Sequence, residues 1–241
     1  VGVQEQQIVF EARIRTDVTK TSDQYCVDLK ILLDVYEVSR ESIEGVIVAS
    51  VVPQVLNSMQ TAVKKLTGKT PLVVGPGLKT GLNIQLENPA QTGADLVVGC
   101  VAALREHKPP MIVIDMGTAT TITVVDKGNK FLGGAIVPGV ALSMNALSSG
   151  TSLLHKVPIE APKKCISTTT SECMQSGAIY GNAALVDGMI DRFQEELGKK
   201  VCVVATGGIA AKIVPHCKRE IAYEEDLLLK GLGIIYRKNK K

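Results

Sequence analysis

The stretch MIVIDMGTATTITVVDKGNKFLGGAIVPG, from Met111 to Gly139, decides how this chain folds. Its first apolar run predicts a buried strand over 111–115, and the next apolar run predicts a second strand over 120–126. The turn residues 127–129 separate that strand from a third one that starts at residue 130. We therefore expect a sheet built around consecutive strands in the middle of the chain.

The first of these strands ends in a single carboxylate, Asp115, which Gly117 and Thr118 follow. Gly117 permits a positive φ, so we expect a tight turn whose N–H groups face one point, as suits phosphate oxygens. A carboxylate beside a phosphate requires a cation between them, and oxygen ligands suit hard ions such as magnesium or potassium. Asp115 is therefore predicted to be a cation ligand. The alternative, equally open on these residues, is an ordinary hairpin turn in which Asp115 caps its own backbone.

A second glycine turn follows a strand further along the chain. The segment VCVVATGGIAAKIV places Gly207 and Gly208 between an apolar strand and the start of a helix. Backbone amides and the helix dipole favour a phosphate at such a position. Together with the turn at Gly117, this pattern predicts a nucleotide site held by Gly117, Thr118, Gly207 and Gly208.

The remaining pattern is that of an α/β protein in which one arrangement of strands and helices occurs twice. Lys108-Pro109-Pro110 interrupts the pattern, so we predict two domains, residues 1–108 and residues 109–241. The expected elements are a hairpin before residue 16, strands at 45–50, 72–74 and 201–205, and helices at 24–38, 53–65, 94–106, 139–148, 170–197 and 224–238.

Composition excludes several classes of protein. A hydrophobic content of 45% with 21% charged residues excludes a disordered chain. The net charge is only +3, and the basic residues at 237, 238, 240 and 241 are expected to form a solvated tail, so we expect no nucleic-acid partner. No apolar segment has the ~18 residues of a membrane span. The six cysteines lack metal-ligand spacing and are expected to be reduced and buried, as in a cytoplasmic protein.

Seven segments of the chain resemble the type III pantothenate kinases, and they follow the family order over nearly the whole length. The resemblance rests on VIVASVVPQV at 46–55, GPGLKTGLNI at 75–84, NPAQTGAD at 88–95, DMGTATT at 115–121, GGAIVPG at 133–139, SECMQSGAIYGNAALVDGMI at 171–190 and ATGGIA at 205–210.

The resemblance implies a function: ATP-dependent phosphorylation of pantothenate to 4'-phosphopantothenate, the first step of coenzyme A biosynthesis. It also implies two ribonuclease-H-like domains of the actin-like ATPase fold with a nucleotide cleft between them. The implied enzyme is a homodimer that uses ATP, Mg²⁺ and a monovalent cation, K⁺ or NH₄⁺, with no membrane partner. By resemblance, Asp95 is the catalytic proton acceptor, Asp115 is the potassium ligand and Thr118 contacts ATP, while the substrate-binding residues are Gly93, Ala94, Asp95, Leu96 and Thr170. Thr170 is equally compatible with an ordinary helix N-cap.

Three departures from the family pattern bear on these expectations. The family's first phosphate loop is expected to lie before Val1. Leu96 occupies the place of an arginine that could pair with the carboxylate of pantothenate, and Leu86 occupies the place of a tyrosine. Lys79 and Arg105 are candidates to replace the lost contacts. Two further hypotheses therefore stay open: a kinase of the same fold for a different small hydroxyl substrate, and a non-catalytic transcription accessory homologue.

Overall fold

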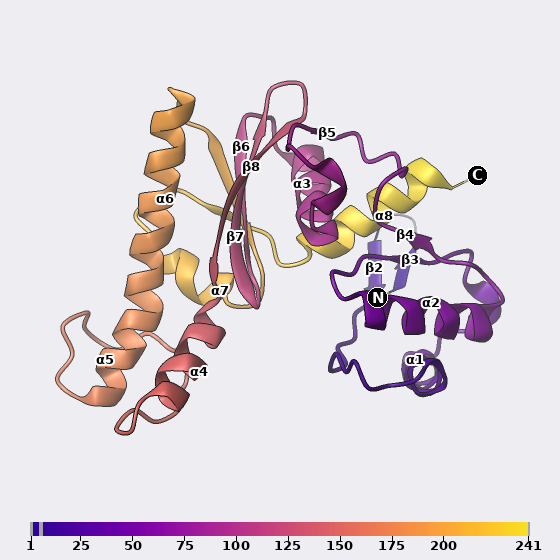
Figure 1. The fold of residues 1–241 in the computed structure, drawn as a ribbon, viewed down its shortest axis with the longest axis horizontal. Helices are drawn as coiled ribbons and strands as arrows, with labels where there is room; N and C mark the ends of the chain where they lie inside the picture. Colours follow the sequence, from indigo (N-terminus) through magenta and orange to yellow (C-terminus); the bar gives the residue numbers. More distant parts are fainter. Residues whose placement is uncertain (1, 5–6, 241) are drawn as a thin grey trace. The chain divides into compact units, whose positions relative to one another are not determined.

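The computed structural model describes residues 2–4 and 7–240, and these form two compact units (Figure 1). Unit 1 contains the chain up to Gly81, Asn88–Ala102 and the chain from Leu228 onward. Unit 2 contains Leu82–Glu87 and Ala103–Leu227. The α/β class predicted from the sequence is confirmed, since each unit combines strands with helices.

Unit 2 is built on a mixed sheet of six strands in the order β10-β9-β6-β7-β8-β5. β6 pairs antiparallel with β7 and β7 with β8, whereas β9, β10 and β5 add parallel to their neighbours. The strands β6, β7 and β8 pair antiparallel in succession, and β9 and β10 continue the sheet in parallel on the free side of β6. This is the strand order of a ribonuclease-H-like sheet. The strands are β5 (Asn83–Ile84), β6 (Met111–Met116), β7 (Ala119–Asp126), β8 (Lys130–Pro138), β9 (Cys202–Thr206) and β10 (Ala222–Tyr223).

The strands predicted over 111–115 and 120–126 are confirmed as β6 and β7, and their core-facing side chains explain why they form. Ile112, Ile114 and Met116 alternate along β6 and belong to one buried apolar cluster. Ile122 and Val124 extend that cluster along β7. A bulge interrupts the pairing of β7 with β8 after Val124. β5 and β10 were not predicted, because two paired residues are too few to produce a strand pattern.

The helices of unit 2 cover the sheet and complete the core. Figure 1 shows α6 (Asn182–Leu197) running along one face of the sheet, and its buried residues Val186 and Ile190 join the same apolar cluster. The predicted helix over 170–197 is one continuous helical run with a change of type: α5 (Thr170–Ser176), a π-helical segment (Gly177–Gly181) and then α6. The other elements are α4 (Val140–Gly150), α7 (Ala210–Ile213) and a 3-10 turn at Val214–His216.

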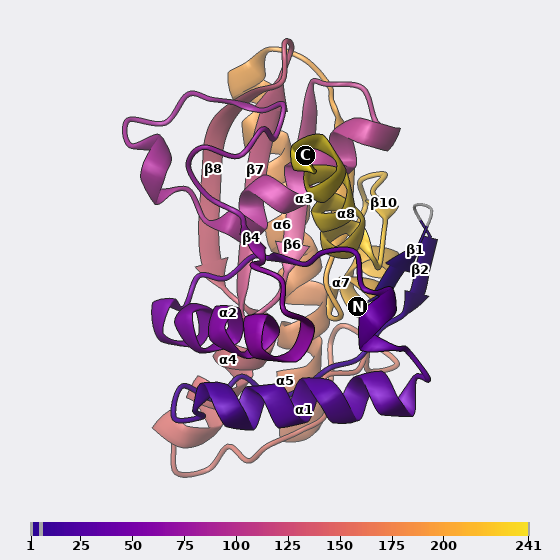
Figure 2. The same ribbon diagram turned by 90° about the vertical axis from the view of Figure 1, so that its right-hand side faces the viewer.

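In unit 1, two helices lie side by side, α1 (Ser22–Val35) and α2 (Pro53–Thr67) (Figure 2). A capping box between Thr21 and Gln24 begins α1, whereas Gly68, at φ +72°, ends α2. Buried Tyr25 donates its hydroxyl to Asp17 O at 2.8 Å and so holds the segment before α1. The strands are β1 (Gly2–Gln4) paired with β2 (Gln7–Phe10), and β3 (Ile47–Val48) paired in parallel with β4 (Leu72–Val73); 3-10 turns lie at Arg40–Ser42 and Pro89–Gln91.

Two helices contribute residues to both units. α3 (Ala94–Glu106) crosses from unit 1 to unit 2 after Ala102, and α8 (Leu227–Asn239) begins in unit 2 and continues in unit 1. Within unit 1, close packing holds α8: Gly231 leaves no room for a Cβ beside Val98 O, and Gly45 lies against Tyr236. The predicted domain ranges 1–108 and 109–241 stay a prediction; the compact units divide a few residues earlier and place most of α8 with unit 1.

Two expectations are wrong in detail. Of the six cysteines, expected to be buried, only Cys100 is buried; Cys26 and Cys217 are half-buried, and Cys165, Cys173 and Cys202 are exposed. Lys241, one of the basic residues expected to form a tail, lies outside the described residues, and the described ones do not form a free tail either. Lys238 lies in α8 and donates to Thr80 O at 2.8 Å, and Lys240 pairs with Glu44.

None of the helices in the described part of the chain combines the length and the apolar character that a membrane span requires.

The core of unit 2 provides a direct test of the packing. Replacing Ile114, which is fully buried, by alanine is expected to lower the free energy of unfolding by about 2–5 kcal/mol, because the removed side chain leaves a cavity. The same change at Ile166, which is 88% exposed, is expected to cost no more than about 0.5 kcal/mol. Urea denaturation of both variants measures the difference, and equal losses would contradict the assigned core.

Candidate active site

A group of the predicted site residues lies at one edge of the sheet in unit 2, where β6 and β9 end together. The parallel pairing sets Asp115 beside Thr206, and Gly207 follows immediately. Gly207 has a φ of +99°, and a Cβ at this position would lie 2.6 Å from Met116 O and 3.0 Å from Asp115 Oδ1. The glycine therefore allows the two strand ends to approach one another as closely as they do. Gly208 has open space around its Cα.

The turn after β6 is also held by a glycine contact. Gly139 N donates to Thr118 O at 3.1 Å, and a Cβ on Gly139 would lie 2.3 Å from that oxygen and 2.4 Å from Gly117 O. Gly139 is the N-cap of α4, so the first turn of that helix lies against the Gly117-Thr118 turn. No role was predicted for Gly139 from the sequence, although it ends the motif GGAIVPG.

The expected phosphate-binding conformation at Gly117 is not observed. Gly117 is absent from the positive-φ glycines of the described chain, and its N–H donates to Ala119 O at 3.0 Å, within the hairpin. The left-handed conformation occurs instead at Gly207. The hairpin geometry explains the difference, because the turn satisfies the Gly117 N–H internally.

This edge of unit 2 offers the groups that a metal-bound phosphate requires. The half-buried carboxylate of Asp115 provides oxygen ligands for a hard cation, and the exposed Thr118 provides a hydroxyl. The positive end of the α4 dipole lies beside them. The residues present therefore fit the predicted cation and nucleotide phosphates, and of the predicted residues the structure brings together Asp115, Gly117, Thr118 and Gly207.

Asp95 lies in unit 1, on the wall of a pocket of about 320 Å³. Most of the pocket is apolar: the end of β3, the loop after it and the first turns of α2 supply Val48, Val51, Val52, Val55, Leu56 and Met59, while Ala49, Ser50 and Thr16 complete it. Asp95 is its single carboxylate. A pocket of this volume with few polar groups is typical of a small-molecule site.

The motif Gly93-Ala94-Asp95-Leu96 has a local explanation at the start of α3. Leu96 N donates to Asp95 Oδ1 at 2.9 Å, which fixes the orientation of the carboxylate in the first helical turn. A Cβ on Gly93 would lie 2.5 Å from the same oxygen, so any other residue there would displace the carboxylate. Ala94 is buried and Leu96 is half-buried.

Thr170 lies in a different pocket, a groove of about 470 Å³ within unit 2. Thr170 is the first residue of α5, and the helix is capped by the preceding residue, Thr169, whose hydroxyl accepts from Glu172 N at 3.3 Å. The alternative in which Thr170 is the N-cap is therefore wrong by one position. The groove is mainly apolar, with Met144 and Leu147 from α4 and Met174 from α5 among its lining residues.

The two residues that depart from the family pattern belong to different units. Leu86 belongs to unit 2, where its Cδ2 lies 3.2 Å from the position of a Cβ on Gly133. Leu96 follows Asp95 directly in α3. Lys79, one candidate to replace the lost contacts, donates its backbone N–H to Asn239 Oδ1 at 2.8 Å in unit 1.

Comparisons with known proteins agree with the sequence motifs. A family described as type III pantothenate kinase matches residues 1–192. A type III pantothenate kinase of Exiguobacterium sp. is 41% identical over 97% of this chain and 92% of its own length. A second one, from Syntrophotalea carbinolica, is 40% identical over 100% of this chain and 94% of its own. The chain therefore belongs to the type III pantothenate kinase family.

A solved structure extends the comparison to the fold. A protein from Campylobacter jejuni, described as a conserved Baf family transcriptional activator, superposes with a TM-score of 0.58 over 88% of each chain at 17% identity. At this identity the likeness concerns the fold alone. The α/β fold is thus shared with a protein of distant sequence.

The close approach at Gly207 leads to a prediction. Gly207→Ala is expected to destabilise the chain by about 1–3 kcal/mol, because alanine is strained at this φ and its methyl group meets Met116 O. Gly208→Ala is the matched control, and there the added methyl group meets no atom within 4 Å. Urea denaturation measures both variants, and a Gly207→Ala variant as stable as the control would contradict the assigned strand-end geometry.

Proposed function

We propose that this protein transfers the γ-phosphoryl group of ATP to the hydroxyl of pantothenate and forms 4'-phosphopantothenate for coenzyme A biosynthesis. Membership of the type III pantothenate kinase family supports both substrates. The observation that carries the assignment within the structure is the oriented Asp95 carboxylate on the wall of an otherwise largely apolar pocket in unit 1.

On the acceptor side, Asp95 receives the proton of the attacking hydroxyl. Phosphoryl transfer needs little covalent chemistry from the protein, but it needs the acceptor oxygen placed and its proton removed. The backbone N–H of Leu96 holds Oδ1, so Oδ2 is the oxygen that we assign as the proton acceptor. The apolar lining excludes water from competing with the substrate hydroxyl. Gly93, Ala94 and Leu96, which adjoin Asp95 in the chain, are proposed as substrate-binding residues, and Thr170, which lies in the separate groove of unit 2, is proposed as one on the family resemblance.

On the donor side, Asp115 holds a cation and Gly117, Thr118, Gly207 and Gly208 line the path of the phosphates. The family implies ATP and a divalent metal ion, and such an ion neutralises charge on the transferred group. A monovalent cation, K⁺ or NH₄⁺, is proposed as the ion that Asp115 ligates. The proposed homodimer, the cytoplasmic location and the nucleotide cleft between domains rest on the family resemblance.

The role of Asp95 is tested by Asp95→Asn in the full chain. The amide has nearly the same shape but cannot accept the proton, so kcat is expected to fall by about 10²–10⁴-fold while ATP binding persists. A coupled ADP-release assay with pantothenate measures turnover, and calorimetry measures ATP binding.

Asp23→Asn is the matched control, because Asp23 is an exposed residue in the first turn of α1 that pairs with Lys65. This control is expected to keep full turnover. A kcat for Asp95→Asn equal to that of the control would exclude Asp95 as the proton acceptor.

Asp115→Asn tests the proposed monovalent-cation site. Replacing the carboxylate is expected to abolish the stimulation of turnover by potassium over sodium, because the amide lacks the negative charge that binds the ion. Asp126→Asn is the control, because Asp126 is the last residue of β7 and lies away from the turn that joins β6 to β7. Lys199 donates to the Asp126 carboxylate at 2.9 Å and thereby lowers the pKa of Asp126. The ratio of rates in potassium and sodium buffers measures the effect, and an unchanged ratio in Asp115→Asn would rule out the assignment.

Leu96 favours one alternative, a kinase of the same fold with another small hydroxyl substrate. Leucine offers no charge for the carboxylate of pantothenate, and it adjoins the assigned proton acceptor. The ADP-release assay with pantothenate, pantetheine and related alcohols separates the two proposals by their relative kcat/KM. Turnover of none of these compounds would instead support the non-catalytic transcription accessory homologue.

A further inference from the structure

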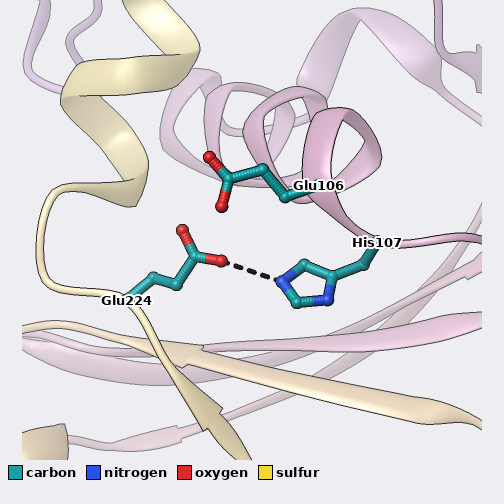
Figure 3. Close-up of side chains that lie close together, drawn as sticks. All are labelled: Glu106, His107 and Glu224. Atoms are coloured by element: carbon teal, nitrogen blue, oxygen red, sulfur yellow. Dashed lines mark hydrogen bonds and ion pairs between the residues drawn. The ribbon is translucent and has the colours of Figure 1, made fainter. Parts of the chain in front are cut away.

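A cluster of three metal-ligating side chains lies in unit 2, apart from the residues assigned to catalysis (Figure 3). Glu106 ends α3, His107 follows it, and Glu224 follows β10. One ligand atom from each residue lies within 4.8 Å of the other two. The cluster therefore joins two segments that are more than a hundred residues apart in sequence.

The backbone on both sides of the cluster is anchored. His107 N donates to Ala103 O at 2.8 Å, which extends the last turn of α3, and Glu224 N donates to Ala205 O at 2.8 Å, which extends the β10 ladder. The side chain of His107 is 21% exposed and that of Glu224 is 13% exposed. Two of the three side chains are thus partly shielded and lie on anchored backbone, whereas Glu106 is exposed.

The imidazole ring is held from both sides. His107 Nε2 lies 2.8 Å from Glu224 Oε1, and His107 Nδ1 lies 3.6 Å from Cys202 Sγ. Fixing one ring nitrogen by an outer contact is how ligating histidines are commonly oriented toward an ion.

The distances between the ligand atoms of the three side chains suit a small divalent ion after a small movement of the side chains. In a tetrahedral site with bonds of about 2.0–2.1 Å, ligand atoms lie about 3.3 Å apart. The His107 and Glu224 atoms would separate by about half an ångström, which side-chain rotation provides. An ion would interact with both carboxylates at once, whereas the hydrogen bond from Nε2 reaches only Glu224. The imidazole favours zinc and similar transition metals over magnesium or calcium, which prefer all-oxygen sites.

We propose that Glu106, His107 and Glu224 form a site for a transition-metal divalent cation of the zinc type. The ion joins the end of α3 to the end of β10 and leaves at least one coordination position to water. The site stabilises unit 2 and takes no part in phosphoryl transfer, so its test is independent of the kinase assignment.

Zinc binding to the full chain tests the proposal, measured by competition with a chromophoric chelator in excess magnesium. The wild-type chain is expected to bind one zinc ion and to show a higher Tm with zinc than without it. His107→Gln and Glu224→Gln are each expected to weaken binding at least about tenfold and to remove the zinc-dependent rise in Tm. His155→Gln and Glu225→Gln are matched controls outside the cluster and are expected to bind as the wild type does.

Two further measurements keep the test decisive. Glu106→Gln changes an exposed side chain, so this variant is expected to fold normally and still bind zinc more weakly. Cobalt replaces zinc as a spectroscopic probe and is expected to give nitrogen and oxygen ligand bands without sulfur-to-cobalt charge transfer. The proposal would be overturned by a wild-type chain that binds no zinc, by equal affinity in the cluster and control variants, or by a thiolate charge-transfer band that places the ion on the free cysteines.

Discussion

The parallel pairing of β6 with β9 is the constraint on which the proposed donor site depends. It brings the ends of both strands to one edge of the sheet, with Asp115 beside Thr206. The chain can turn there only because Gly207 lacks a side chain, since a Cβ would overlap Met116 O. Gly139 has the same role on the other side of the turn after β6. The positions of Gly207 and Gly139 thus determine where the carboxylate of Asp115 and the hydroxyl of Thr118 lie.

A different device orients the carboxylate of unit 1. Asp95 lies in the first turn of α3, where one backbone N–H fixes Oδ1, and Gly93 leaves space for that oxygen. The lining of its pocket is largely apolar, so the charge faces few competing polar groups. The proposed reaction therefore combines a cation ligand held by strand ends in unit 2 with a proton acceptor held by a helix start in unit 1.

The sequence predicted those features that local pattern determines. The strands around Asp115 and the exact span of α3 follow from apolar periodicity and from clear turn residues. Local pattern could not show that Gly207 and not Gly117 has the positive φ, because the hairpin satisfies the N–H of Gly117 internally and the close approach to Met116 O occurs at Gly207. It also missed β10, which is too short to read and exists through its pairing with β9.

Tertiary packing accounts for the other differences. The basic residues at the end of the chain were expected to form a tail, but Arg237 and Lys238 belong to α8, and Lys238 donates to Thr80 O. His107 and Glu224 are far apart in sequence, and no spacing rule connects them; only the fold places them 2.8 Å apart. A contact of this kind depends on how β10 and α3 are positioned by the sheet, which composition and periodicity do not specify.

The central claim is that the strand-end edge formed by Asp115 and Gly207 receives the phosphates of ATP. A crystal structure of the full chain with magnesium and a non-hydrolysable ATP analogue tests this claim most directly. The account predicts the phosphates beside the turns at Gly117 and Gly207, with a cation on the carboxylate of Asp115. A nucleotide bound elsewhere, with Asp115 contacting neither the phosphates nor a cation, would contradict it.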